Sequence, residues 1–188
     1  MYRFFKVIFR LGDYYRGVKL YLLIRICGGR CLGIPKVGKN VIFKYPPHKG
    51  ISIGVKCDIG SFIQFDVPPN ASLEIGDYVK LTNNINIAAA KSILIKSDVL
   101  IAEGVSIRDS QHFFKNSNVA INKQGLEVGS IEIDEDVWIG KNSMILLNTH
   151  LKKGCVIGAN TLVKEKITDE YGIYIGSPLR KIKNRESL

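Results

Sequence analysis

The chain has 188 residues, with 27 basic and 17 acidic side chains and a hydrophobic content of 46%. This length suits one domain with a sizeable core, and the composition excludes a disordered chain and a multi-span membrane protein. The sequence contains no window of about 18 uncharged apolar residues, and its start holds no apolar run long enough for a signal peptide. We therefore expect a cytoplasmic protein.

The net charge of +10 is concentrated at the two ends of the chain. Residues 1–30 hold seven basic side chains against Asp13 alone, and the last residues add Arg180, Lys181, Lys183 and Arg185 against Glu186. Two basic ends on a nearly neutral body suit an anionic membrane surface and a phosphorylated cofactor at least as well as a nucleic-acid groove.

The N-terminal segment, residues 1–35, is predicted to form one or two amphipathic helices rich in Tyr, Phe and Arg. Two interpretations of this segment remain open. It contacts the inner face of a membrane, or it packs against the end of the following domain or against a neighbouring subunit.

Residues 36–175 carry a repeat of six residues. Aliphatic or aromatic side chains recur at this interval in four series: Ile53, Ile59, Phe65; Ile75, Leu81, Ile87; Ile95, Ile101, Ile107; and Ile133, Ile139, Ile145, Leu151, Ile157, Val163. A helix with 3.6 residues per turn cannot keep this interval on one face. Two inward positions and a tight turn in every six residues predict a parallel β-solenoid with three sides and about 18 residues per coil.

Two interruptions of the repeat are informative. The step from Ile87 to Ile95 is eight residues, and a longer interruption predicts a loop at about 110–130. Long excursions from a regular scaffold are commonly functional. After the repeat, residues 176–188 are expected to form a basic tail.

His112 is the best placed of the three histidines, because it lies at the mouth of the long loop. A general base that acts on an alcohol should titrate near neutrality, which favours histidine. His48 and His150 are expected to be ordinary turn or surface residues. Asp109 is close enough to orient the imidazole of His112, or it caps the corner of its own coil.

Cys27, Cys31, Cys57 and Cys155 have the spacing of neither a secreted disulfide framework nor a common zinc knuckle, so we expect reduced thiols and no metal.

The pattern aliphatic-Gly-x-x-small-x over about residues 37–183 resembles the hexapeptide repeat of left-handed parallel β-helix acyltransferases. Residues 101–112, which end in His112, and the segment Val137-Trp-Ile-Gly140 are similar to the active-site stretch of sugar O-acetyltransferases, including the O-antigen and capsule enzymes. The resemblance implies a left-handed coil, a homotrimer and acetyl-CoA as donor. It also implies that His112 deprotonates the acceptor hydroxyl, which then attacks the thioester directly.

The resemblance also implies roles for further residues. Asn84 would line the acceptor pocket, although a turn asparagine is equally expected there. Trp138 would lie beside the pantetheine arm of the cofactor and the catalytic histidine, where it would also bind the substrate, or it would lie at a subunit contact. Small and basic residues near the C-terminus would hold acetyl-CoA: Gly140, Ala159, Lys164, Arg180 and Lys183. Glu165 stands where the family usually has a cofactor-contacting lysine, so the phosphate contacts stay open.

The sequence therefore predicts an O-acetyltransferase that acts on a sugar of bacterial surface polysaccharide. The main alternative is an N-acetyltransferase that acts on a nucleotide-linked amino sugar, although no Gly-rich nucleotide-binding fingerprint occurs. A zinc-dependent β-helix carbonic anhydrase is disfavoured, because His112 has no histidine partners in its loop. A structural or nucleic-acid-binding solenoid is also disfavoured, since the chain has no stacking platform or helix-turn-helix pattern.

Overall fold

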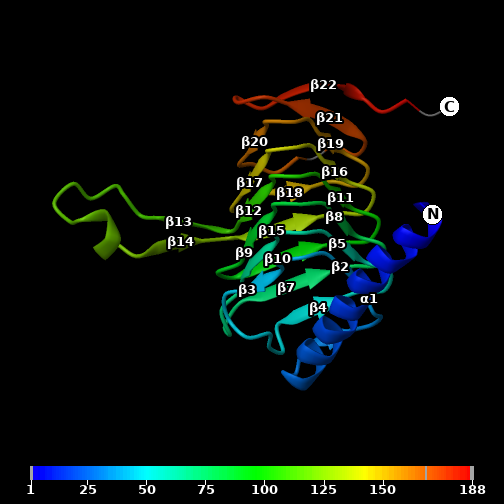
Figure 1. Ribbon diagram of the computed structural model, residues 1–188. Coiled ribbons are helices and arrows are strands. Elements are labelled where there is room, and N and C mark those ends of the chain that lie inside the picture. The colour runs from blue at the N-terminus through cyan, green and yellow to red at the C-terminus, as the bar shows by residue number, and fades with distance from the viewer. Residues whose placement is uncertain (1, 168, 187–188) are drawn as a thin grey trace.

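The computed structural model describes residues 2–167 and 169–186. Met1 of the N-terminal segment and residues 187–188 of the expected tail lie outside this range. The described chain begins with a single helix, α1 (Tyr2–Ile26), and continues into a stack of short strands (Figure 1). Within the described residues, no helix combines the length and the apolar character needed to cross a membrane.

Three parallel sheets form the three sides of the stack. Sheet A contains β1 (Arg30–Cys31), β4 (Ile51–Ile53), β7 (Ser72–Ile75), β10 (Ser92–Ile95), β15 (Ser130–Ile133) and β18 (His150–Leu151). Sheet B contains β2 (Lys36–Val37), β5 (Asp58–Ile59), β8 (Lys80–Leu81), β11 (Leu100–Ile101), β16 (Trp138–Ile139), β19 (Val156–Ile157), β21 (Gly172–Ile175) and β22 (Arg180–Asn184). Sheet C contains β3 (Ile42–Phe43), β6 (Gln64–Asp66), β9 (Asn86–Ala88), β12 (Ser106–Arg108), β17 (Met144–Leu146) and β20 (Leu162–Val163). The predicted left-handed parallel β-helix is confirmed.

The chain visits sheets A, B and C in turn, so each coil has three corners, which we name AB, BC and CA after the sheets they join. The six-residue steps run along the sides of a coil, as in Ile53, Ile59 and Phe65 on β4, β5 and β6. The coils themselves vary in length. Ile139 pairs with Ile157, 18 residues on as predicted, but Ile59 pairs with Leu81, 22 residues on. The additional residues of the longer coils fall at corner CA, as in 67–71 between β6 and β7.

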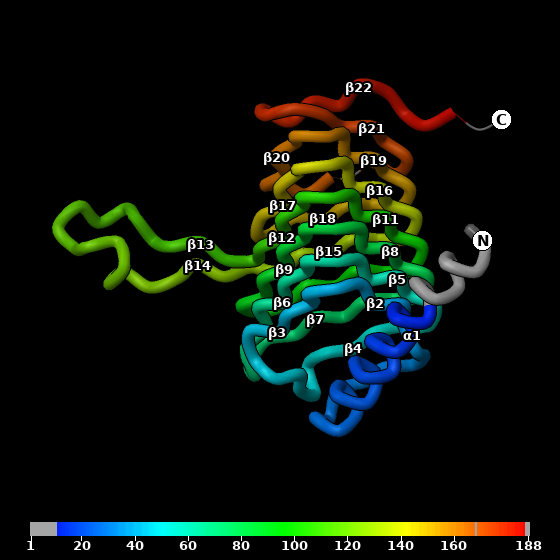
Figure 2. Tube along the Cα trace, viewed as in Figure 1, coloured from blue at the N-terminus to red at the C-terminus, as the bar shows by residue number. Residues whose placement is uncertain are grey.

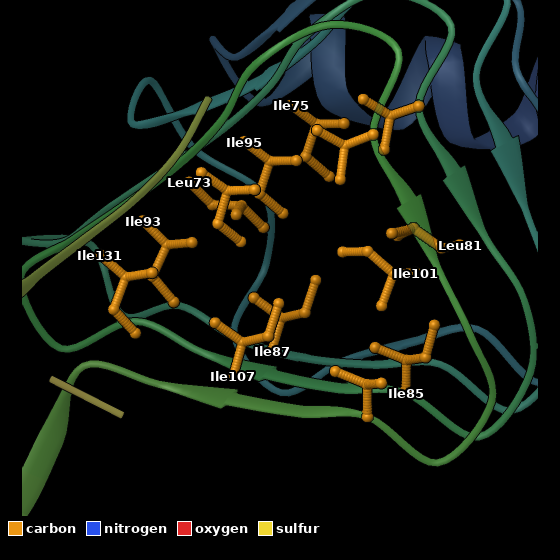
Figure 3. Packing of buried hydrophobic residues seen from close by; sticks show 14 of the residues in the cluster. Leu73, Ile75, Leu81, Ile85, Ile87, Ile93, Ile95, Ile101, Ile107 and Ile131 are labelled. Atoms are coloured by element: carbon orange, nitrogen blue, oxygen red, sulfur yellow. The ribbon is translucent and has the colours of Figure 1, made fainter. Parts of the chain in front are cut away.

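The interior of the stack is a single column of aliphatic side chains. Figure 3 shows residues of successive coils, such as Ile87, Ile95 and Ile101, pointing inward from the three sides. These three side chains are at most 1% exposed. Burial of an aliphatic side chain of this size is worth about 1.5–3 kcal/mol, so the repeated column is the main source of stability.

The corners require unusual backbone conformations and close approach between coils. Four asparagines occupy the same left-handed position of corner BC, with φ between +54° and +57°: Asn40, Asn84, Asn142 and Asn160. Asparagine tolerates this region better than most residues. Gly60 lies at corner BC of another coil, where Phe62 takes the left-handed position, and a Cβ atom on Gly60 would lie 1.6 Å from the carbonyl oxygen of Thr82 in the next coil. Glycine is therefore required at this step.

The two ends of the stack are covered differently. At the N-terminal end α1 packs against β1 and β2, where Leu20 and Ile24 join the core. At the C-terminal end β22 pairs with β21 in antiparallel fashion, so part of the segment expected as a tail is a strand. Figure 2 shows α1 and the long excursion from corner CA on opposite sides of the stack.

Candidate active site

The long loop that carries His112 is a β-hairpin that projects from corner CA (Figure 1). Its strands are β13 (Ser110–His112) and β14 (Leu126–Val128), which pair in antiparallel fashion, and the 3₁₀ helix η1 (Ile121–Lys123) lies towards its tip. The Gln111 side chain donates a hydrogen bond to Glu127 at 2.8 Å across the hairpin. His112 is paired with Leu126, and its side chain is exposed. The hairpin therefore holds His112 close to the body of the solenoid.

His112 lines a cleft of about 570 Å³ between the base of the hairpin and sheet C. The other residues of the cleft come from six successive segments of the chain: Lys44, Tyr45, Asp66, Pro68, Ala88, Ala89, Ala90, Arg108, Ser110, Gln111, Leu126, Leu146 and Leu147. This volume is within the range of small-molecule sites. The cleft combines an imidazole with apolar walls and a few charged groups, which is the arrangement of a ligand site.

The charged residues of the cleft belong to a ladder at the ends of the sheet C strands. Asp66 pairs with Ala88, Ala88 with Arg108, and Arg108 with Leu146 in adjacent coils. Lys44 belongs to the preceding coil, and its ammonium group lies 2.8 Å from the carboxylate of Asp66. Arg108 forms no hydrogen bond or ion pair with another side chain of the described residues. Its guanidinium group is therefore available to an anionic ligand.

The methyl side chains of Ala88 and its two neighbours, Ala89 and Ala90, line the cleft where the step from Ile87 to Ile95 breaks the six-residue repeat. The register position of Ala88 is occupied by longer side chains in the coils that follow, namely Arg108 and Leu146. Small residues in the middle of a ladder of long ones leave the hollow that a substrate would fill.

Asp109 is fully buried, and its carboxylate bonds to backbone groups and not to His112. Its carboxylate accepts three hydrogen bonds from backbone N–H groups of the previous coil, from Ala90 at 2.6 Å and from Lys91 and Ser92 at 2.8 Å. The structure thus places Asp109 in the corner-capping position that the sequence left open. It supports the base of the hairpin, because its own carbonyl oxygen accepts the N–H of Gly129, where the hairpin ends.

Asn84 and Trp138 lie away from the cleft. Asn84 is an exposed residue of corner BC with φ +57°, in the same position as three other asparagines. Trp138 is 49% exposed on β16 of sheet B, the side of the triangle opposite corner CA. Within one chain, the structure does not bring either residue to His112.

The predicted cofactor residues are divided among three places. Gly140 and Ala159 stack at corner BC, where a Cβ on Gly140 would lie 2.6 Å from the backbone nitrogen of Ala159. Arg180 and Lys183 are exposed on β22. Lys164 lines a second cleft, of about 230 Å³, which borders the hairpin through Gln111 and Glu127. Of these five, Lys164 alone shares a cleft with hairpin residues.

A second group of charged residues, on the outer face of sheet A, was missed by the sequence analysis. The Lys96 ammonium group lies 2.6 Å from Asp134 and 3.0 Å from Glu132, and His150 Nε2 lies 3.1 Å from Asp134. Burial opposes ionisation of Asp134, but the hydrogen bonds from Lys96 and His150 outweigh it and lower its pKa. Glu132, Asp134 and His150 could together offer ligands to a metal ion. Lys96 already supplies a positive charge there, so the group is an ion-pair network.

Arg108, Lys44 and Asp66 were also missed. Lys44 and Asp66 are 22 residues apart and lie in adjacent coils. A spacing of 22 residues would have aligned them, but it can be predicted only when the lengths of the CA corners are known.

A hexapeptide solenoid with one histidine-bearing hairpin over a cleft defines a repeat protein with an enzyme-like site. The chain is 31% identical over 140 residues to WbbJ of Escherichia coli K12, whose name assigns it to O-acetyl transfer in lipopolysaccharide biosynthesis, and the match covers 71% of each chain. The chain therefore belongs to the hexapeptide-repeat acyltransferase family.

Two further relatives are similar over different extents. Rv3034c of Mycobacterium tuberculosis, named as an acetyltransferase, is 34% identical over 115 residues, which cover 61% of this chain and 38% of the relative. The dTDP-4-amino-4,6-dideoxy-D-glucose acyltransferase of Escherichia coli is 26% identical over 163 residues, covering 82% and 84%. No protein-family model matches the chain.

Solved structures share the fold. A mutant of AntD, an N-acyltransferase from Bacillus cereus in complex with dTDP and coenzyme A, has a TM-score of 0.78 at 22% identity, covering 93% of this chain and 91% of AntD. The hexapeptide-repeat acetyltransferase VCA0836 of Vibrio cholerae, complexed with acetyl coenzyme A, has a TM-score of 0.59 at 20% identity, covering 90% and 78%.

Proposed function

We propose that the chain transfers an acetyl group from acetyl-CoA to a hydroxyl group of a sugar destined for bacterial surface polysaccharide. The observation that carries this proposal is the exposed His112 at the base of the hairpin, on a cleft large enough for a sugar. Membership of the acyltransferase family and the similarity to WbbJ support the reaction and the acceptor class.

In the proposed reaction the imidazole of His112 accepts the proton of the acceptor hydroxyl as its oxygen attacks the thioester carbonyl. The tetrahedral intermediate collapses with cleavage of the C–S bond. The proton on His112 passes to the departing thiolate, which leaves as coenzyme A. No covalent acyl-enzyme is needed, and no metal takes part.

Arg108 fits this proposal as a group that binds an anion. Its guanidinium group lines the same cleft and is free of side-chain partners among the described residues. A phosphate carried by the acceptor or by coenzyme A would satisfy it. We assign Lys164 to the donor side, because it lines the second cleft beside the hairpin. The proposal keeps Gly140, Ala159, Arg180 and Lys183 as further donor contacts.

Transfer to an amine is the second candidate, supported by the similarity to an amino-sugar acyltransferase. The two reactions differ in their need for a base. A hydroxyl group is too weak a nucleophile unless a base removes its proton during the attack. An unprotonated amine attacks without that help, and its nitrogen loses a proton afterwards, which the departing thiolate can accept.

Thiol release from acetyl-CoA, measured against panels of sugars, amino sugars and nucleotide-linked sugars, tests the proposal. With a hydroxyl acceptor, His112→Ala should lower kcat by about 10²–10⁴-fold. His150→Ala is the matched control, because it removes a histidine from sheet A and should leave kcat close to wild type. Turnover with amines alone would move the chain to the N-acyl branch, and full turnover by His112→Ala would exclude the proposed base.

We also propose that the active form is a homotrimer. The hairpin carries six exposed apolar side chains: Phe113, Phe114, Val119, Ile121, Leu126 and Val128. A neighbouring copy would cover them and could bring its own Trp138 and Asn84 to His112, as the predicted roles of those two residues require. A site shared between subunits would then form at each interface of a cyclic trimer.

Sedimentation velocity measures the assembly, and co-expression of two inactive variants tests the shared site. If His112 and Trp138 come from different subunits, a mixture of His112→Ala and Trp138→Ala chains should recover about a quarter of wild-type activity, since random assembly leaves that share of interfaces intact. A mixture that stays inactive, or a monomeric wild type, would contradict the shared site.

A further inference from the structure

Helix α1 presents two apolar faces, and the solenoid covers one of them. Leu20 and Ile24 are buried against the first coils. On the opposite side, five apolar residues recur at helical spacing and are between 38% and 82% exposed: Leu11, Tyr15, Val18, Leu22 and Ile26. Intervals of three and four residues place all five on one face, which we call the outward face.

The outward face is continuous. A single exposed leucine on a protein surface is ordinary, but a row of large apolar side chains along four turns of a helix indicates a surface that another molecule covers. Since α1 already packs through Leu20 and Ile24, the outward face is not needed to hold the helix on the solenoid.

Basic side chains border the outward face on both sides. With 100° per residue, Lys19 follows the apolar arc on one side and Arg25 on the other, and both are exposed. The Lys19 ammonium group lies 4.5 Å from the centre of the Tyr15 ring. Asp13, the one acidic residue among residues 1–30, is paired with Arg16. An apolar arc between cations, without a free carboxylate, is the pattern of a helix that lies in an anionic membrane interface.

A groove runs along the Lys19 side of the helix and extends this surface. It has a volume of about 240 Å³ and is lined by residues of α1 and of the first coil: Arg16, Lys19, Leu20 and Leu23 from α1, and Val37, Gly38, Asn40, Val41 and Phe43 from the coil. Apolar walls with two cations suit part of a lipid, whose acyl chain and phosphate need both kinds of contact.

A second copy of the chain fits this surface less well than a bilayer does. Residues 1–30 carry a net charge of +6, from seven basic side chains and Asp13. Two such faces packed on each other would bring like charges together, whereas an anionic surface would attract them. The hairpin that we propose for trimer contacts lies on the other side of the solenoid from α1 (Figure 2).

We propose that the outward face of α1 binds an anionic membrane surface, with its apolar residues among the lipid chains and Lys19 and Arg25 at the lipid phosphates. The protein would then work as a peripheral enzyme at a membrane. This proposal is independent of the acceptor and of the role of His112.

Vesicle flotation with the full-length chain tests the proposal. The probes are vesicles of phosphatidylcholine alone and vesicles that also contain about 30% phosphatidylglycerol. Wild type should bind the anionic vesicles at least tenfold more tightly, and binding should weaken as salt rises from about 0.1 to 1 M. The double variant Leu22→Glu/Ile26→Glu should bind at least tenfold more weakly, since two inserted side chains are lost.

The matched control is Ile175→Glu/Ile182→Glu, which makes the same charge change at residues that are 42% and 57% exposed at the other end of the stack. It should bind like wild type, and circular dichroism with a urea midpoint checks that both variants fold. Equal binding by the two double variants, or no binding of wild type to anionic vesicles, would overturn the proposal. So would an outward-face substitution that lowers the sedimentation coefficient without vesicles, because a second copy would then cover the face.

Discussion

Substitution of Asp109 separates a structural role for this carboxylate from a role as the partner of His112. The two variants are Asp109→Asn, which keeps the shape but removes the charge, and Asp109→Ala, which removes the group. In the structure one carboxylate oxygen accepts the Ala90 N–H, and the other accepts the N–H groups of Lys91 and Ser92. All three donors belong to the corner that lies under the hairpin.

The expected destabilisation follows from these three bonds. A hydrogen bond to a charged group contributes about 1.5–3 kcal/mol, and loss of a buried charged partner commonly costs about 3–5 kcal/mol in total because the contributions are not additive. Asp109→Ala should therefore lower the free energy of unfolding by about 3–5 kcal/mol, or the Tm by about 6–20 °C in a chain of this size. Asp109→Asn should cost about 2–3 kcal/mol, because its amide N–H₂ would face one of the three donors.

Urea unfolding followed by circular dichroism measures the stability, and thiol release at saturating acetyl-CoA measures kcat. We expect the urea midpoint to fall in both variants. In Asp109→Asn, kcat measured well below the unfolding transition should fall by less than about tenfold, since the His112 ring has no bond to lose. An unchanged urea midpoint combined with a fall in kcat of about 10⁴-fold, as for the orienting aspartate of a triad, would refute this reasoning.

Two further predictions concern titratable groups outside the cleft. The lowered pKa of Asp134 stabilises the fold above the pKa of the unfolded carboxyl, near 3.9, and this stabilisation is lost as the pH falls through the lower folded value. Asp134→Asn should therefore lower the free energy of unfolding at pH 7 by about 1–2 kcal/mol, and the urea midpoint with it. The difference from wild type should shrink as the pH falls below about 3.9, and a constant difference through this range would contradict the assignment. Burial raises the pKa of Cys57 to about 11 and of Cys155 to about 12, and also raises that of Cys31. At pH 8 a disulfide reagent should modify the half-buried Cys27 rapidly in the native protein and all four thiols after unfolding, and rapid native modification of Cys27→Ser would show that the core opens.

The fold could be predicted because its signal repeats. Every sixth residue is aliphatic, as at Ile133, Ile139 and Ile145, so each side of a coil carries the same buried position. Where one position leaves the assignment of a strand ambiguous, the next position of the repeat resolves it. The parallel pairing of the strands then follows from stacking the coils. The lengths of the individual coils had no such support, because corner CA is free to hold a few residues or many without disturbing the core.

The site could be predicted only in part, because the lengths of the CA corners decide which side chains come together and the repeat does not determine those lengths. His112 could be found because it opens the longest interruption of the repeat. Arg108 and Lys44 could not, because they belong to different coils and come to line one cleft only through pairings that depend on corner length. The role of Asp109 was undecided for a related reason. Its partners are backbone N–H groups some 17–19 residues earlier, which no local pattern in the sequence marks.

The position of the candidate site follows from the variable length of corner CA. Sheets A, B and C keep their register because each contributes to the aliphatic column, so changes in length are tolerated mainly where the chain returns from sheet C to sheet A. At that corner a three-residue turn over Ala89 and Ala90 lies one coil before a hairpin of about twenty residues, a difference whose entropic cost grows only slowly with length. The short turn leaves the hollow and the long hairpin brings His112 over it. Asp109, whose carboxylate holds the short turn while its backbone holds the end of the hairpin, joins the two halves of the cleft.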